Sequence, residues 1–112
     1  MVTESAPERG DLVWLPLDPQ TEHEQGGRRP ALVISPCSYN EKVGLALFCP
    51  VTTRIKDYPF EVALPSGGEI SGVALADQIK SLDWRARRAE QASTVPPEVV
   101  REVLAKVRVL VL

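Results

Sequence analysis

Two side chains of complementary chemistry, Glu24 and Arg29, stand five residues apart in the segment 24–30. A carboxylate can take up or release a proton, and a guanidinium presents a fork of donors that matches a phosphate and does not deprotonate. Together they suit phosphoryl transfer, provided that burial or loop closure raises the pKa of Glu24 above its ordinary value of about 4.3. The same two residues are also compatible with a surface ion pair of little energetic weight.

Cleavage of RNA without a metal needs three groups around one phosphate: a base for the ribose 2′-OH, a cation for the phosphorane, and an acid for the leaving oxygen. A pair of histidines cannot supply them, because His23 is the only histidine. Thr52 and Thr53 follow an apolar run, and their hydroxyls could bind a phosphate oxygen or only satisfy backbone groups. Lys56 is a cation of suitable reach, or an ordinary solvated lysine.

A metal site is not expected, because one histidine and the two separated cysteines, Cys37 and Cys49, do not make a credible zinc site. No cofactor is implied either. In a reducing cytosol two free, mostly buried thiols are expected rather than a disulfide. Cys49 is assigned to the core, since a catalytic cysteine would want a histidine base. Trp14 and Trp84 could stack bases, but at least one is expected to pack in the core.

The net charge of −2 argues against a protein that coats nucleic acid indiscriminately. The charges are unevenly distributed, however. Residues 25–56 carry five basic side chains against one acid, and a second basic cluster spans 85–88. Such stretches could line a groove for a short single strand, or could simply be solvated faces. The five bases are Arg28, Arg29, Lys42, Arg54 and Lys56, and the acid is Glu41.

The 112 residues fit one domain, 1–112, with 44% apolar residues to form a core. No stretch has the roughly 20 apolar residues that cross a bilayer, and the N-terminus lacks the features of a signal peptide. A cytoplasmic protein without a membrane association is therefore expected.

The pattern of the chain predicts a small barrel rich in β-strands that ends in a helix. Strands are expected over 11–17, 31–34, 45–52 and 60–64, with one or two more within 72–82. Residues 18–28 form a long polar loop, 36–43 a turn-rich connection, and 85–94 a charged, irregular stretch with room for a short strand at its start.

Residues 96–110 predict the terminal helix. Pro96 or Pro97 suits its first turn, Thr94 is a candidate cap, and Glu98 complements the helix dipole. An apolar stripe would pack against the barrel or against a partner subunit. The final Val-Leu-Val-Leu could alternatively extend as a strand. The stripe consists of Val99, Val103, Val107 and Leu110.

From about residue 9 to its end, the chain resembles the MazF/PemK family of toxin endoribonucleases. The resemblance rests on four blocks in combination, each weak alone. These are 10–14 (Gly-Asp-Leu-Val-Trp), 24–36 (Glu-Gln-Gly-Gly-Arg-Arg-Pro and the apolar run after it), 50–53 with 58–62 (Pro-Val-Thr-Thr, Tyr-Pro-Phe-Glu-Val), and 72–87, which contains Asp-Gln-Ile-Lys.

The resemblance implies an SH3-like (CcdB/MazF-type) small β-barrel that acts as a homodimer. It implies sequence-specific cleavage of single-stranded RNA, mainly mRNA, that leaves a 2′,3′-cyclic phosphate and a 5′-OH. Arg29 and Thr52 would hold the scissile phosphate, and Glu24 would act as general base or acid. Asp77 matches a family acid near the site, but the PemK-like branch has an arginine where this chain has Leu75. The chemistry therefore falls to Glu24 and Arg29.

Substrate binding is expected from the residues that surround this centre, namely Thr53, Lys56, Asp77, Gln78, Lys80 and Arg87. The family also implies a cognate MazE-like antitoxin, whose acidic tail would occupy the RNA groove.

Two other functions compete with this one. A toxin of the gyrase-poisoning CcdB type would grip another protein and would not need Glu24, Arg29 and Thr52 together. An inactive module that binds RNA or sequesters an antitoxin would keep RNA binding without Glu24 and would form no product.

Overall fold

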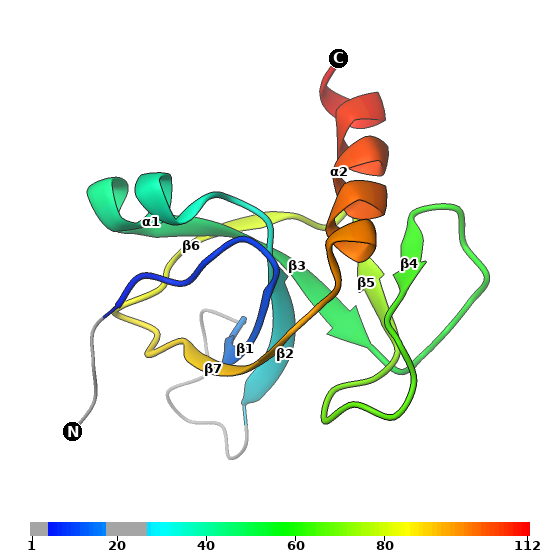
Figure 1. Ribbon diagram of the computed structural model, residues 1–112, viewed down its shortest axis with the longest axis horizontal. Coiled ribbons are helices and arrows are strands. Elements are labelled where there is room, and N and C mark those ends of the chain that lie inside the picture. The colour runs from blue at the N-terminus through cyan, green and yellow to red at the C-terminus, as the bar shows by residue number, and fades with distance from the viewer. Residues whose placement is uncertain (1–4, 18–26) are drawn as a thin grey trace.

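The computed structural model describes residues 5–17 and 27–112 (Figure 1). The predicted mainly β chain with a C-terminal helix is confirmed. Most of the expected loop 18–28, with His23 and Glu24, lies outside the described residues. The elements are β1 (Asp11–Pro16), β2 (Arg28–Val33), α1 (Cys37–Val43), β3 (Leu45–Thr52), β4 (Glu61–Ala63), β5 (Val73–Leu75), β6 (Lys80–Asp83), β7 (Glu90–Thr94) and α2 (Pro97–Val111).

The strands form one antiparallel sheet in the order β4-β5-β3-β2-β1-β7, and β6 also pairs with β3. Strand β3 is the hub of this sheet. One of its edges pairs with β2, while the other pairs with β6 along Leu45–Phe48 and with β5 at Val51 and Thr52. No pairing joins β4 to β7 in the described ranges, so the curled sheet is an open form of the expected barrel.

Both faces of the central strands are covered, as their continuous apolar runs predict. Alternate residues of a strand point to opposite faces. Leu32 and Cys49 therefore belong to a cluster beneath α2, whereas Val33 and Phe48 belong to a second cluster that contains Trp84. The run 31–34 is buried along its whole length. Burial on both faces makes β2 and β3 a rigid support for side chains at their ends.

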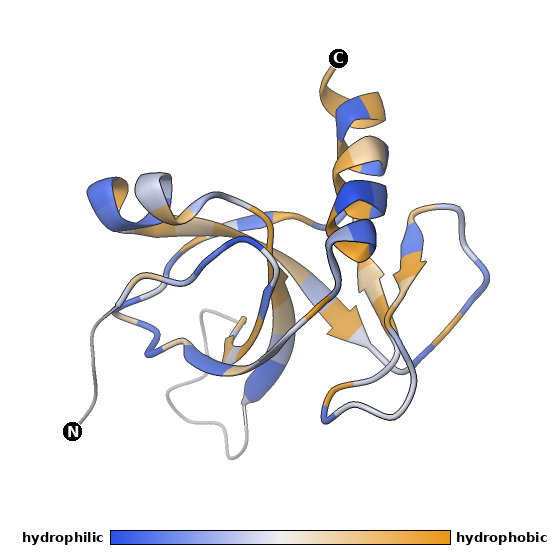
Figure 2. Ribbon diagram, in the orientation of Figure 1, coloured by the Kyte–Doolittle hydropathy of each residue, from blue (hydrophilic) through white to orange (hydrophobic). Residues whose placement is uncertain are grey.

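Helix α2 packs its first half against the sheet and then projects away from it (Figure 1). Val99 and Val103 of the predicted stripe are buried, whereas Leu110 at its far end is 48% exposed. Its neighbours Val109 and Val111 are 72% and 70% exposed, and Figure 2 shows this end as largely apolar. The alternative of a terminal strand is wrong, because the helix continues to Val111.

The helix begins one residue later than predicted, with Pro97 in its first turn. Thr94 does not cap it. The N-cap is Pro96, without a side-chain cap, because Thr94 is engaged in β7 opposite Asp11. None of the helices in the described part of the chain is long and apolar enough to cross a membrane.

The turn-rich connection predicted for 36–43 is instead the short helix α1, held at its C-terminus by Gly44 at φ +84°. Its inward residue is polar. The Asn40 amide is fully buried, donates to the carbonyls of Pro7 (2.9 Å) and Ser35 (3.0 Å), and accepts from the Ser35 hydroxyl. The Trp84 indole N–H donates to the Asn40 carbonyl at 2.8 Å. The buried side chain of Asn40 takes the place of the apolar stripe by which helices are recognised in a sequence, so the pattern did not predict this helix.

The stretch 85–94 was predicted with a strand at its start, and the structure places β7 at its end instead. Residues 84–88 form a turn in which Arg88 adopts φ +54°. The five residues of β7 then pair with β1. Because β7 is an edge strand, its polar side chains stay in solvent. The strand therefore lacks the apolar pattern from which the other strands were predicted.

Candidate active site

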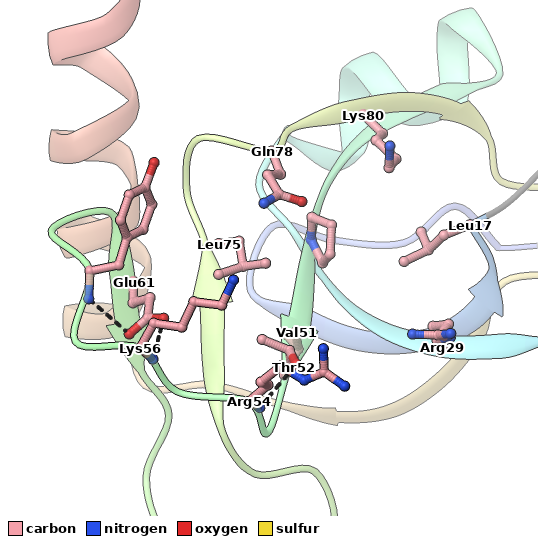
Figure 3. Close-up of a pocket in the computed structure, with 12 residues that line it drawn as sticks. Leu17, Arg29, Val51, Thr52, Arg54, Lys56, Glu61, Leu75, Gln78 and Lys80 are labelled. Carbon is pink, nitrogen blue, oxygen red and sulfur yellow. Dashed lines mark hydrogen bonds between the residues drawn. The ribbon is translucent and has the colours of Figure 1, made fainter.

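A groove of about 540 Å³ lies where β2, β3, β5 and the 54–61 segment converge with the start of β6 (Figure 3). The ends of the two rigid central strands meet an irregular segment there, an arrangement that often carries function. Its lining is Leu17, Arg29, Pro50, Val51, Thr52, Arg54, Lys56, Tyr58, Glu61, Leu75, Gln78 and Lys80.

Thr52 is the last residue of β3 and lies half-buried at the groove. Its hydroxyl oxygen accepts a hydrogen bond of 3.0 Å from the backbone N–H of Arg54. Threonine commonly closes a turn in this way, by bonding to the backbone two residues further on. The oxygen is thereby oriented, and the hydroxyl hydrogen can be donated to a ligand.

The backbone of Gly72 packs directly against the backbone of Thr52. It has φ +113°, and a Cβ built on it would lie 2.1 Å from the Thr52 carbonyl oxygen. Any other residue would therefore clash with backbone that cannot move as a side chain does. This close approach brings β5 against β3, where Thr52 pairs with Val73.

Arg29 reaches the groove from β2, where it pairs with Leu15 and precedes Pro30. Its neighbour Arg28 points to the other face, donates to the carbonyls of Trp14 (2.9 Å) and Arg88 (2.7 Å), and lies 3.7 Å from Glu90. The side chain of Arg29 is exposed and makes no hydrogen bond or ion pair with another described residue. Of the two arginines, Arg28 binds backbone and Arg29 remains available for an anion.

Lys56 lies on the segment between β3 and β4, which Glu61 organises. The Glu61 carboxylate accepts the backbone N–H groups of Lys56 at 2.9 Å and of Tyr58 at 3.3 Å (Figure 3). From α2, the Lys106 ammonium donates to the Pro59 carbonyl at 2.6 Å. These contacts leave the side chain of Lys56 on the wall of the groove.

Asp77 lies behind this wall in the turn after β5. One of its carboxylate oxygens accepts a hydrogen bond from the Tyr58 hydroxyl, and the other is buried without a partner in the described part of the chain. That hydrogen bond, with some desolvation and the charge of Asp77, raises the pKa of Tyr58. Burial, with a smaller effect of Asp77, raises the pKa of the Cys49 thiol to about 12. Cys49 is thus a neutral core residue, and both cysteines are free.

Five of the residues singled out from the sequence meet at the groove, and three other described ones do not line it. Thr53 is exposed beside it, and Asp77 stands behind Tyr58. Arg87 donates to the Pro16 carbonyl at 2.8 Å, at the end of β1. Glu24 lies outside the described residues. The five that meet are Arg29, Thr52, Lys56, Gln78 and Lys80.

Tyr58 and Glu61 line the groove, yet sequence reasoning did not single them out as site residues. Both fall within the block 58–62 that carries part of the family resemblance, and this block was the available signal. Arg54 was noted only as part of a basic stretch.

The groove is suited to an anion. Four cationic side chains line it, and the one described carboxylate in its lining, Glu61, already accepts two backbone N–H groups. Clefts lined by one sign of charge concentrate ligands of the opposite sign. A phosphodiester bound here would meet a guanidinium from β2 and a hydroxyl from β3. The four cations are Arg29, Arg54, Lys56 and Lys80.

Known proteins resemble the chain along almost its whole length. It is 52% identical over 111 residues to the endoribonuclease toxin MazF of Escherichia coli K12, covering 99% of each chain. It is 38% identical over 116 residues to the endoribonuclease toxin ChpB of the same strain, again covering 99% of each.

Two solved structures share its fold. The crystal structure of MazF (Form-I) from Deinococcus radiodurans superposes with a TM-score of 0.85 at 57% identity, covering 95% of this chain and 96% of that one. A MazE–MazF structure (Form-II) from the same organism has a TM-score of 0.84 at 52% identity and covers 95% of both chains. Residues 8–111 match the family described as PemK-like, MazF-like toxins of type II toxin–antitoxin systems. By sequence and fold, the chain belongs to this family.

Proposed function

We propose that this protein is the toxin of a type II toxin–antitoxin system, a sequence-specific endoribonuclease that cleaves single-stranded mRNA and thereby inhibits translation and growth. The observation that carries the proposal is the convergence of Arg29 and Thr52, from two adjacent buried strands, on one cationic groove. The full-length similarity to an endoribonuclease toxin supports it.

In the proposed reaction, the ribose 2′-oxygen attacks the neighbouring phosphorus and the bond to the 5′-oxygen breaks. The products are a 2′,3′-cyclic phosphate and a 5′-OH. Arg29 stabilises the charge of the phosphorane through its paired N–H donors, and the Thr52 hydroxyl donates to a non-bridging oxygen. Glu24 serves as general base or acid. As base it takes the proton of the 2′-OH, and the leaving 5′-oxygen takes a proton from water; as acid it protonates the leaving oxygen, and water takes the proton of the 2′-OH. This chemistry uses no metal.

Substrate binding in this proposal falls to the residues around the centre. Lys56, Gln78 and Lys80 line the groove and would contact phosphates or base edges. Thr53, Asp77 and Arg87 are proposed to assist from positions beside or behind it.

The proposed partners follow from the same surfaces. A MazE-like antitoxin with an acidic segment would compete with RNA for the cationic groove, and relatives have been crystallised as MazE–MazF complexes. A homodimer would cover the apolar end of α2, where Val109 and Val111 stand in solvent. We place the protein, as one toxin domain over 1–112, in the cytoplasm, where mRNA is found.

The test is incubation of the purified protein with a long RNA, followed by mapping of the cut ends and their chemistry. Wild-type protein is expected to cut at a defined sequence in the presence of EDTA. Arg29→Ala and Glu24→Ala should abolish cleavage while they remain folded by circular dichroism. The matched control is Arg101→Ala, which removes an exposed arginine of α2 away from the groove. Cleavage at the wild-type rate by both Arg29→Ala and Glu24→Ala would refute the proposal, and RNA binding without product would replace it with a binding module.

A further inference from the structure

The segment 53–60, which carries Lys56 to the groove, has no strand of its own. It is held by side chains from three other elements: Glu61 of β4, Asp77 of the turn after β5, and Lys106 of α2. Two of these contacts act on the backbone. The third is a bond between two side chains, from Tyr58 to Asp77, and it bridges the segment to the turn that precedes Gln78.

Among the described residues, the Tyr58 hydroxyl is the one hydrogen-bond donor to the half-buried carboxylate of Asp77. A hydrogen bond donated to a carboxylate is roughly twice as strong as one between neutral groups. Because the other oxygen of Asp77 is buried and unpaired, loss of the Tyr58 hydroxyl would leave the whole group without a donor there. The pKa of Tyr58 is raised, so the phenol keeps the proton that it donates.

The backbone between Lys56 and Tyr58 is in an unfavourable conformation that the surrounding contacts must hold. Asp57 adopts φ +57°, which is uncommon for residues other than glycine, although aspartate tolerates it better than most. On either side of it, the N–H groups of Lys56 and Tyr58 bind the two oxygens of Glu61. The Tyr58 side chain is the further anchor that ties this turn to the groove wall.

We propose that Tyr58 is a positioning residue, whose hydroxyl latches the 53–60 segment to Asp77 and so holds the Lys56 ammonium where it binds an RNA phosphate. The inference rests on the proposed endoribonuclease function. It assigns the contribution of Asp77 to holding Tyr58 rather than to contact with RNA. Substrate binding depends on this latch because Lys56 does. The chemical step does not depend on it, because Arg29 and Thr52 lie on strands outside the latched segment.

The test compares Tyr58→Phe, which keeps the ring and removes the hydroxyl, with Lys56→Ala and the double variant. Binding is measured with a fluorescent 2′-O-methyl RNA oligonucleotide that contains the mapped cleavage sequence and lacks the attacking 2′-OH. Tyr58→Phe should weaken binding roughly three- to tenfold and reduce the slope of log K against log salt by about 0.7, the value for one phosphate contact on a single strand. Lys56→Ala should do the same, and the double variant should be no weaker than Lys56→Ala.

Cleavage kinetics supply the second readout. KM should rise for Tyr58→Phe, while kcat stays within about twofold of wild type. The matched control is Tyr39→Phe, because Tyr39 is a 39% exposed tyrosine on α1, away from the groove. The control should leave binding, salt slope and KM unchanged.

If the wild-type protein cleaves RNA, three results would overturn the proposed latch. They are wild-type RNA binding by Tyr58→Phe, losses of RNA affinity that multiply in the double variant, and a fall in kcat at constant KM for Tyr58→Phe. Wild-type behaviour of Tyr58→Phe with a loss in Tyr58→Ala would mean that the ring itself contacts the RNA. A wild-type protein that does not cleave RNA would overturn the proposed function, and this inference with it.

Discussion

Gly72→Ala is expected to damage both stability and cleavage, because it drives a methyl group into the strand that ends in Thr52. The added Cβ would lie 2.1 Å from the Thr52 carbonyl oxygen, and ordinary contacts begin at 3.4 Å. Relief requires a shift of more than about 1 Å in closely packed backbone. The strand β3 must therefore move, and Thr52 moves with it.

Two costs add at this position. Placing alanine at φ +113° costs on the order of 1–3 kcal/mol, and overpacking costs about 1–3 kcal/mol more. Gly67→Ala isolates the first cost, since Gly67 has φ +88° and its added Cβ would meet nothing within 4 Å. For a domain of this size each kcal/mol lowers Tm by about 4–8 °C. Gly72→Ala should therefore melt roughly 4–24 °C below Gly67→Ala.

The assay is thermal unfolding by circular dichroism, followed by RNA cleavage well below both melting temperatures. A misplacement of about 1 Å at a reacting group can cost on the order of 100-fold in rate. Gly72→Ala should show a loss approaching this size, and Gly67→Ala should cleave like wild type. Equal melting temperatures for the two variants would refute the steric reasoning. Full cleavage activity in Gly72→Ala would refute the role given to the position of Thr52.

Three further predictions concern other parts of the molecule. Asn40→Ala leaves up to three buried polar groups without partners, at about 1–3 kcal/mol each, so chemical denaturation should show a loss of roughly 3–5 kcal/mol. Because burial raises the pKa of Cys49 to about 12, iodoacetamide at pH 8.5 should alkylate the half-buried Cys37 and spare Cys49 in the native protein, as read by mass spectrometry. Val109→Asp combined with Val111→Asp should convert a dimer to a monomer in sedimentation experiments.

Each of these predictions has a control in the same chain. Glu41→Ala removes an exposed neighbour of Asn40 and should leave the denaturation midpoint nearly unchanged. Denatured protein should alkylate at both cysteines, and equal labelling of both in native protein would contradict the burial argument. Val43→Asp alters a valine of α1 that is 49% exposed, and it should not change the sedimentation coefficient. A dimer that survives both α2 substitutions would place the subunit contact elsewhere.

The parts of the fold that followed from the sequence are those dictated by local pattern. Continuous apolar runs identify β2 and β3, and alternation identifies β4, where Val62 is buried and Ala63 is exposed. Helix α1 was missed, although Pro36 before it and Gly44 after it are recognised signals for helix ends. Its inward residue is Asn40, whose side-chain amide binds Pro7 and whose backbone carbonyl binds Trp84, and both partners are remote in sequence.

In the candidate site, too, the residues could be predicted from the sequence but the contacts between remote residues could not. The family resemblance assigned Arg29 and Thr52 to a phosphate-binding centre, and both residues line the groove. Their shared groove depends on the pairing of β2 with β3, which sequence spacing does not encode. The contacts that hold the 53–60 segment could not be predicted from the sequence, because Tyr58 and Asp77 are 19 residues apart and Pro59 and Lys106 are 47 apart.

The pairing of β3 with three other strands also governs how the molecule opens. Local unfolding separates cooperative units, and amide hydrogen exchange reports the free energy of each opening. Because β2, β5 and β6 all bond to β3, no opening that spares the rest of the sheet can release its central amides. The amides of Phe48 and Cys49 should therefore exchange only through global unfolding. Those of Lys56 and Tyr58 are exposed and bonded to the Glu61 carboxylate, and they should exchange far sooner. The groove thus joins the slowest-exchanging part of the chain to one of the fastest.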